Sequence, residues 1–500
     1  MTGDHSPIRI VVIGGGIAGL SAAHRLVELR DEKKFPLDMT LFEAGDHLGG
    51  VIRTMKQNGF LIEAGPENFI TTKPAALALC RRIGLTDQLL PTNEEHRRAL
   101  VVHRGKLHPV PEGFLMLAPT QFLPFAMSPL FSWRGKLRMA MELFLPAKKH
   151  NDDESLASFV TRRLGREAFE RVAQPLVSGI YTADAYTLSL RTTMPRFLQM
   201  EEQHGSIIKA MWCERRAAAR ARKERSGGTG SRGGDSGARY SIFVSFKNGL
   251  QTLVDALAAR LPAGTVRINQ RVARIAPAPG DTEEDGKPHL LYITLENGTR
   301  LEADGVIITG PAHHAAALVE NFDTALAAQL STIQYASSVV VSVAYRQSDV
   351  SHPLDGFGFV IPEVEKRSII ASSFSSVKFP GRAPEGHVLL RCFIGGAIRP
   401  DAYEWDDDRM VTAVRQEMKD LLGIEKKPLF TLVHRHYKSM PQYPVGHLKH
   451  IARIKEQLAR HPGLLLAGNA YGGIGIPDCV QSGEEAANNL VVALMVRITV

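Results

Sequence analysis

The sequence predicts an α/β protein built around a doubly wound parallel sheet. The run IRIVVIG (residues 8–14) is apolar throughout, which is typical of a parallel strand buried on both faces. A glycine turn and the helix-like stretch IAGLSAAHRLVEL (17–29) come next, and DMTLFEA (38–44) reads as a second strand. Residues 463–491, at the other end of the chain, repeat the order of strand, glycine turn and helix. The two ends of the chain are therefore expected to close one domain.

Three glycines in the first turn, Gly14, Gly16 and Gly19, form the pattern GxGxxG. The first permits a tight turn, the second lets the main chain approach a pyrophosphate, and the third lets the helix pack against the strand. The helix N-terminus favours anions at the same place. Glu43 ends the second strand, where its carboxylate can accept hydrogen bonds from ribose hydroxyls and disfavours a 2′-phosphate. The pattern predicts a dinucleotide site, with a purely structural turn as the alternative.

The residues after Glu43 decide between NAD and FAD. A second glycine pair, Gly49 and Gly50, lets the main chain approach the cofactor again, and Arg53 can neutralise phosphate charge. An NAD site does not need this element. A flavin is long, so its ring needs a second helix N-terminus, which the glycine turn ahead of Val480 provides. The sequence therefore favours FAD.

The composition sets limits on the class of protein. A chain of 500 residues exceeds what one hydrophobic core usually organises, so two or three domains are expected. The four cysteines lie far apart without a CxxC pair, which argues against a disulfide framework or a zinc site and favours the cytoplasm. The histidines of HRHY (434–437) lack acidic or cysteine partners at ligand spacing, so no metal is expected.

The formal net charge of +8 comes largely from one segment. Residues 214–239 hold eight Lys or Arg against three Asp or Glu and are rich in Gly and Ser. This composition predicts a flexible basic loop, placed at residues 211–239. Nucleic-acid binding is not expected, because no aromatic side chains are interleaved for base stacking.

Residues 113–133 are strongly apolar, but Pro119, Pro124 and Pro129 interrupt them, so no membrane span is expected. A buried irregular segment is the favoured interpretation, and peripheral membrane contact is the alternative. The first residues lack a charged region followed by an apolar one, so no cleavable signal is expected.

Several stretches resemble one known group of enzymes. GGVIRT (49–54) and AGNAYGGIGIPDCVQSGEEAA (467–487), with the first glycine motif, are similar to the amine oxidase and protoporphyrinogen oxidase superfamily of FAD flavoproteins. PLVSGIYTADAYTLSLRTTMP (175–195), EEQHGSIIKAM (201–211) and SMPQYPVGHL (439–448) resemble the oxygen-dependent porphyrinogen oxidases, above all the soluble bacterial branch that acts on coproporphyrinogen III. The similarity covers nearly the whole chain except the basic loop and the termini.

The resemblance implies a Rossmann-like FAD-binding domain, a mixed-sheet substrate domain and an inserted α-helical domain, which carries the membrane contact in membrane-bound relatives. Apolar runs such as SSVVVSVAY (337–345) fit a sheet that roofs a flat pocket. The expected segments are 1–72, 240–310 and 430–500 for the FAD-binding domain, 73–94 and 311–429 for the substrate domain, 95–210 for the helical domain and 211–239 for the basic loop.

The resemblance also implies non-covalent FAD. Cys479 lies beside the flavin motif, but the linking cysteine of monoamine oxidases lies in a different local pattern. His436 occupies a position where soluble bacterial relatives often carry tryptophan near the flavin. The expected cofactor-binding residues are Gly14, Gly15, Gly16, Ile17, Ala18, Gly19, Glu43, Ala44, Gly49, Gly50, Val51, Ile52, Arg53, Gly65, Pro66, Glu67, Asn68, Val272, His436, Gly475, Ile476 and Pro477.

The implied reaction, part of haem biosynthesis, oxidises coproporphyrinogen III to coproporphyrin III. Hydride passes from a meso carbon to flavin N5, and the reduced flavin passes electrons to dioxygen, which gives hydrogen peroxide. Orientation is the main requirement, so no catalytic side chain is assigned. The expected substrate-binding residues are Lys73, at the pocket mouth, and Ile180 and Tyr181, which line the pocket.

Three alternatives stay open. Protoporphyrinogen IX could be the main substrate, although Ala99 lies near the position of an arginine in the eukaryotic enzymes. The chain could be another FAD amine oxidase or desaturase, or a flavin-binding protein without catalysis. Further partners implied by the resemblance are a ferrochelatase that takes the product and, at most, a membrane surface contacted peripherally.

Overall fold

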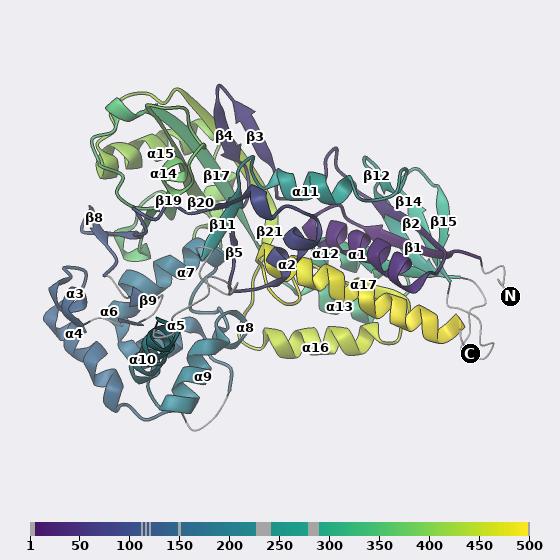
Figure 1. Cartoon of the computed structure of the whole chain (residues 1–500), viewed down its shortest axis with the longest axis horizontal. Helices are drawn as coiled ribbons and strands as arrows, with labels where there is room; N and C mark the ends of the chain where they lie inside the picture. Colours follow the sequence, from purple (N-terminus) through teal and green to yellow (C-terminus); the bar gives the residue numbers. More distant parts are fainter. Residues whose placement is uncertain are drawn as a thin grey trace.

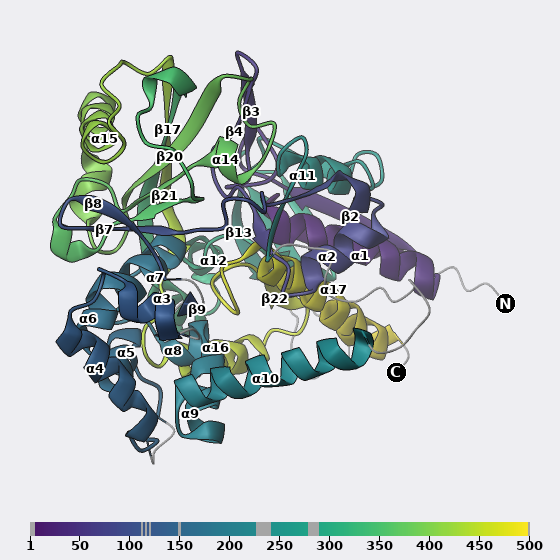
Figure 2. The same ribbon diagram turned by 60° about the vertical axis from the view of Figure 1, so that its left-hand side comes forward.

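A computed structural model of the chain describes residues 6–111, 114–115, 118–119, 122–148, 152–226, 242–278 and 290–498. Its elements form three regions (Figures 1 and 2). A parallel sheet with its helices lies in the half of the molecule that holds both termini, a larger sheet lies at the upper left of Figure 1, and a group of helices lies below that larger sheet. The colours show that the parallel-sheet region combines the first and last parts of the chain.

The parallel sheet has five strands, and every neighbouring pair is parallel. β1 pairs β2 on one side and β16 on the other, so the strand order reverses at β1, as in a doubly wound fold. The predicted fold class is confirmed. In spatial order the strands are β12 (Val266–Arg267), β2 (Leu37–Phe42), β1 (Ile8–Ile13), β16 (Gly305–Ile308) and β22 (Leu464–Leu466).

Both faces of this sheet are covered, which explains why β1 is apolar throughout. Ile10 and Val12 pack against helices on one face, whereas Val11 packs into a second core on the other. The first face carries α1 (Ile17–Lys33), α2 (Ala75–Arg82), α11 (Gln251–Ala258) and α17 (Ile476–Ile498). The second face carries β13 (Val272–Pro277), β14 (Leu291–Leu295), β15 (Arg300–Ala303), α12 (Ala312–Val319), α13 (Thr324–Ser331) and α16 (His447–Leu458).

The two ends of the chain meet where α17 packs along α1 (Figure 1). The approach is closest at Gly483, where a Cβ atom would lie 2.2 Å from the carbonyl oxygen of Ala18. Only glycine fits at this position without a shift of the main chain. Because Gly483 lies two turns after the start of α17, the contact brings both glycine turns into the same part of the molecule.

The larger sheet has seven strands and is mixed, because β18 and β7 pair in parallel and the other neighbours are antiparallel. Apolar side chains on one face, such as Val341 and Leu390, pack against α15 (Asp407–Leu422). The strands in spatial order are β21 (Phe430–Pro441), β17 (Tyr335–Arg346), β20 (His387–Gly395), β19 (Ala371–Ser373), β18 (Gly358–Val360), β7 (Leu100–His103) and β8 (Lys106–Pro109).

The helical region is organised around a buried ion pair. The side chains of Arg163 and Glu142 are fully buried and hydrogen-bonded to each other, and Glu142 also accepts the N–H of Ile207 at 2.8 Å. The helices are α3 (Phe122–Met127), α4 (Trp133–Ala140), α5 (Leu156–Leu164), α6 (Arg166–Ala168), α7 (Gln174–Tyr181), α8 (Leu190–Thr193), α9 (Pro195–His204) and α10 (Ile207–Ser226).

Short elements link the regions. The pair β3 and β4 forms a hairpin, and β11 lies between β5 and β6 in a three-stranded sheet. Their bounds are β3 (Thr54–Gln57), β4 (Phe60–Glu63), β5 (Phe69–Ile70), β6 (Leu89–Pro91), β9 (Phe114–Leu115), β10 (Ala118–Pro119), β11 (Phe243–Phe246) and α14 (Ser375–Lys378).

The structure differs from the expected segments at three places, while the domain boundaries as a whole remain predictions. β7 and β8 lie in the range expected to be helical, and β21 lies in the range expected for the FAD-binding domain, yet all three join the seven-stranded sheet. The third difference is α10, which continues to Ser226 into the expected loop. Its sequence ERRAAARARKER consists of strong helix formers. The rest of that loop, up to residue 239, lies outside the described residues.

The apolar stretch 113–133 is only partly buried where it is described. Phe125, Leu130 and Phe131 are buried, as expected, whereas Met127 and Trp133 are exposed, so the expectation of a buried segment is wrong for these two. Across the part of the chain that the structure describes, no helix is both long enough and apolar enough to cross a membrane.

Candidate active site

The glycines of the first turn have two different roles. A Cβ atom at Gly19 would lie 1.9 Å from the carbonyl oxygen of Gly14, so this glycine is required by the contact of α1 with the turn. A Cβ atom at Gly16 would have no protein atom within 4 Å. The main chain at Gly16 therefore faces open space, as a pyrophosphate that approaches the start of α1 requires.

Glu43 is held rigidly beside this turn. Its two carboxylate oxygens accept the N–H groups of Gly15 and Gly45, each at 2.7 Å. Each oxygen keeps a further lone pair, which suits a ribose hydroxyl. The N–H of Gln270 donates to the carbonyl oxygen of Glu43 at 2.9 Å, so the segment leading to Val272 runs alongside the same end of β2.

The second glycine pair is joined to the first turn. The N–H of Gly49 donates to the carbonyl oxygen of Gly15 at 2.8 Å, and Gly49 and Gly50 have positive φ angles of 108° and 61°. This conformation favours glycine. It leaves Val51 and Arg53 exposed next to the turn while Ile52 is buried. Arg53 is therefore free of the protein core and accessible to a phosphate.

Residues 64–67 are tied to the seven-stranded sheet. His436 Nε2 donates to the carbonyl oxygen of Ala64 at 2.9 Å, and Arg391 donates to that of Gly65. The Glu67 carboxylate accepts four further protein donors, which are Arg391 Nη1 (2.9 Å), Lys378 Nζ (3.1 Å), Ser373 Oγ (2.9 Å) and Ser375 Oγ (2.7 Å). The side chain of Glu67 is thus committed to the protein. Only its main chain could contact a cofactor, and there the carbonyl oxygen also accepts the Ser245 hydroxyl at 2.7 Å.

Neighbouring positive charges keep the buried Glu67 carboxylate ionised. Burial alone would raise its pKa, but the nearby charges of Lys378 and Arg391 hold it well below its ordinary value. Burial lowers the pKa of His436, so its imidazole is neutral and donates through Nε2. A histidine fixed in this way does not reproduce the broad ring of the tryptophan expected in relatives.

One face of the sheet carries buried polar atoms without protein partners. Ser342 on β17 is opposite Arg391 on β20, and His434 on β21 lies on the same face one row away. Among the described residues, Ser342 Oγ, Arg391 Nε and His434 Nε2 are buried and lack a hydrogen-bond partner. Such groups normally pair with a ligand or ordered water. This face adjoins residues 64–67, so it fits a bound group at that position.

Sequence reasoning missed Ser342 and Arg391 and considered His434 only as a metal ligand. The signal for Arg391 was a single charged residue within the apolar run HVLLRCFI (387–394). Within the described parts of the chain, no group of three or more His, Cys, Asp or Glu side chains could hold a metal ion.

The second glycine turn precedes α17, with Gly475, Ile476 and Pro477 at the start of the helix. The N–H of Gly475 donates to Asp478 Oδ2 at 3.2 Å, while the first main-chain N–H groups of α17 point toward the turn. The next residue, Cys479, is buried, and this burial raises its pKa to about 12. Its thiol therefore stays protonated and is a poor nucleophile, which supports non-covalent flavin.

Two of the three expected substrate residues, Lys73 and Tyr181, lie close to Asp478. Lys73 Nζ contacts its two carboxylate oxygens at 2.7 and 2.8 Å. Tyr181 lies within range of its charge, and burial together with Asp478 raises the pKa of Tyr181 to about 12. Ile180 is half exposed at the end of α7. The structure thus brings Lys73 and Tyr181 to the start of α17, although they are far apart in sequence.

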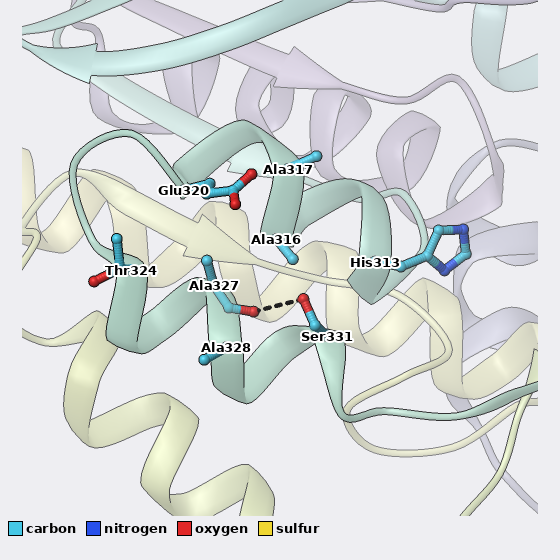
Figure 3. A pocket seen from close by; sticks show the side chains of 8 residues that line it. All are labelled: His313, Ala316, Ala317, Glu320, Thr324, Ala327, Ala328 and Ser331. Atoms are coloured by element: carbon cyan, nitrogen blue, oxygen red, sulfur yellow. Dashed lines mark hydrogen bonds between the residues drawn. The ribbon is translucent and has the colours of Figure 1, made fainter.

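A separate pocket of about 280 Å³ lies between α12 and α13 (Figure 3). Four of its eight lining residues are alanines, and the side chain of His313 lies at one end, directed away from Glu320 and Thr324. Burial lowers the pKa of His313 to about 4, so this side chain is neutral. The pocket shares no residue with the glycine turns or with the Lys73 and Asp478 contact.

Two glycine turns at helix N-termini, a fixed carboxylate beside the first of them and a polar sheet face that adjoins residues 64–67 fit a flavin-dependent oxidoreductase. The sequence matches the family described as flavin containing amine oxidoreductase over residues 17–491, so the chain belongs to this family. Its cofactor is FAD, as predicted.

Within this family, the chain is similar to several porphyrinogen oxidases. The chain is 35% identical to a coproporphyrinogen III oxidase of Bacillus subtilis, over 97% of this chain and 98% of that protein. It is 33% identical to a coproporphyrinogen III oxidase of Propionibacterium freudenreichii, with 98% and 92% covered. It is also 30% identical to a chloroplastic protoporphyrinogen oxidase of Nicotiana tabacum, with 98% and 86% covered.

Solved structures agree with this fold. A putative protoporphyrinogen oxidase from Exiguobacterium has a TM-score of 0.81 at 29% identity, with 98% of this chain and 99% of that chain covered. A reduced UDP-galactopyranose mutase has a TM-score of 0.68 at 17% identity, with 97% and 96% covered, and shares the fold alone.

Proposed function

We propose that the chain oxidises coproporphyrinogen III to coproporphyrin III in haem biosynthesis, with dioxygen as the electron acceptor and hydrogen peroxide as the product. The full-length similarity to coproporphyrinogen III oxidases is the observation that carries this proposal. The domain division and the cofactor residues predicted from the sequence are part of it.

Bound flavin supplies a two-electron acceptor for hydride removal from a meso carbon of the substrate. The residues of the chain bind and orient the cofactor and the substrate. Arg391 and His436 fix residues 64–67, Glu43 holds the adenosine end, and Tyr181 stays protonated beside the substrate. We assign no acid or base, because the neighbouring pyrroles share the positive charge that develops. Orientation then accounts for most of the rate gain.

Lys73 should favour coproporphyrinogen III, which has four propionates, over protoporphyrinogen IX, which has two propionates and two vinyls. A partly exposed ion pair is worth on the order of 1 kcal/mol, so Lys73→Ala should lower kcat/KM for coproporphyrinogen III about fivefold and for protoporphyrinogen IX less. Steady-state oxygen uptake with both substrates checks this. Equal losses, or a wild-type preference for protoporphyrinogen IX, would contradict the assignment.

Protoporphyrinogen IX as the main substrate is the second candidate, favoured by the plant relatives. Ala99 argues against it, because the arginine that the eukaryotic enzymes place near this position is missing. The amine oxidases among the structural neighbours, at 14 to 16% identity, share only the fold and do not support an amine substrate.

For location and partners, we propose the cytoplasm, hand-off of product to a ferrochelatase, and at most peripheral membrane contact. The four cysteines are free in the structure, which supports a reducing compartment. Exposed apolar side chains on α3, α4 and the adjoining turn support the membrane contact, namely Met127, Trp133, Leu137, Met141 and Phe144. Co-sedimentation with anionic vesicles should be weak and reduced by Trp133→Ser, and a protein that is extracted only by detergent would contradict this.

A further inference from the structure

The contact between Lys73 and Asp478 joins two parts of the chain that are 405 residues apart in sequence. Both carboxylate oxygens accept the lysine ammonium, at 2.7 and 2.8 Å. Lys73 is 50% exposed, whereas Asp478 is only 14% exposed. The ammonium that is expected to meet a substrate carboxylate therefore already holds a carboxylate of the protein.

Asp478 is the fixed partner of this pair. A Cβ atom at Gly473 would lie 2.4 Å from Asp478 Cγ, so the side chain occupies space that only a glycine leaves open. The N–H of Gly475 also donates to Oδ2 at 3.2 Å. Lys73, by contrast, has a long flexible side chain and half of its surface in solvent. The carboxylate stays in place while the ammonium is able to turn to another partner.

The two groups that can pair with Lys73 have the same chemistry. A propionate and the Asp478 side chain are both carboxylates, and an ammonium has only three N–H donors, of which Asp478 engages two. Substrate and product carry the same propionates, because the oxidation changes only the ring. A lysine without a protein partner would hold both more firmly, so the product would leave more slowly.

We propose that Asp478 sets the strength of the propionate anchor by competing with the substrate propionate for Lys73. This inference rests on the proposed porphyrinogen substrate. In the free enzyme Asp478 occupies Lys73, and a bound propionate displaces it in whole or in part. The competition limits the strength of the anchor, so the product leaves more readily.

The test is a double-mutant cycle on the FAD-loaded enzyme, with the binding of coproporphyrin III followed by porphyrin fluorescence. The variants are Asp478→Asn, Lys73→Ala and the double variant. Asparagine keeps an oxygen that can accept the N–H of Gly475, and flavin absorbance checks that FAD is retained. Should Asp478→Asn lose FAD, Asp478→Ser also removes the charge and keeps an acceptor. Glu484→Gln is the matched control, because Glu484 also lies on α17 but pairs with Arg82 away from the site.

Asp478→Asn should tighten coproporphyrin III binding about threefold, and Lys73→Ala should weaken it about as much. On the Lys73→Ala background, Asp478→Asn should change the dissociation constant little, because the ammonium for which Asp478 and the propionate compete is missing. The control should match the wild type. Product release, measured by stopped flow, should slow in Asp478→Asn.

Three results would overturn the inference. If Asp478→Asn tightened coproporphyrin III binding equally with and without Lys73, the Asp478 carboxylate would act only by repelling the propionates. If the double variant bound coproporphyrin III as tightly as the wild type, Lys73 would serve only to neutralise the charge of Asp478. Unchanged binding in Lys73→Ala would mean that Lys73 does not hold a propionate. Oxidation of coproporphyrinogen III by the wild type tests the proposed function separately, so the two failures are distinguishable.

Discussion

Gly16→Ala should lose FAD while the apoprotein stays folded. The φ angle of Gly16 is −71° with extended ψ, which alanine adopts without strain, and its Cβ would meet no protein atom within 4 Å. The added methyl would occupy only the space that the cofactor needs. FAD affinity, measured by titration of apoprotein, should fall at least tenfold, while the melting temperature of the apoprotein changes little.

Gly19→Ala is the matched comparison for this prediction. Its Cβ would clash with the carbonyl oxygen of Gly14, so this variant should destabilise the apoprotein as well as lose FAD. Retention of FAD by Gly16→Ala at wild-type affinity would show that the first turn does not approach the pyrophosphate.

Arg391→Ala should destabilise the protein by about 3 kcal/mol, because it removes one cation from a buried ion pair and leaves the Glu67 carboxylate with Lys378 and two serine hydroxyls. The free energy of unfolding, from urea denaturation, measures this loss. The pH dependence has a definite sign. Since the folded pKa of Glu67 is depressed, its stabilisation is present above the unfolded pKa, about 4.3, and is lost as pH falls toward the folded value.

The difference between wild type and Arg391→Ala should therefore shrink below about pH 4.3. Arg346→Ala is the control, because Arg346 is an exposed arginine at the end of the neighbouring strand β17 and should change stability by less than about 0.5 kcal/mol. A pH-independent difference, or a loss as small as the control's, would show that Arg391 does not stabilise the charge of Glu67.

The FAD-binding half was predictable from the sequence because its signals are local. Gly14, Gly16 and Gly19 lie within six residues, and Glu43 ends the next strand, so turn, helix and carboxylate follow from short-range pattern. The apolar run of β1 indicates burial on both faces without knowledge of its neighbours. These features explain why the fold class was predicted correctly.

The sheet that covers the site was less predictable, because strand pairing joins distant segments. Nothing in the local sequence of β7 or β21 states that both belong with β17 and β20. The same is true of contacts between side chains. Glu67 and Arg391 are 324 residues apart, and Lys73 and Asp478 are 405 apart. Their partners become known only when the sheet and α17 are in place.

Anaerobic reduction of the bound flavin tests the central claim most directly. Purified protein should be yellow, and coproporphyrinogen III added without oxygen should bleach its flavin absorbance, whereas putrescine and other amines should leave it unchanged. Readmission of oxygen should restore the colour and produce hydrogen peroxide. A colourless protein, or bleaching by an amine and not by coproporphyrinogen III, would contradict the account.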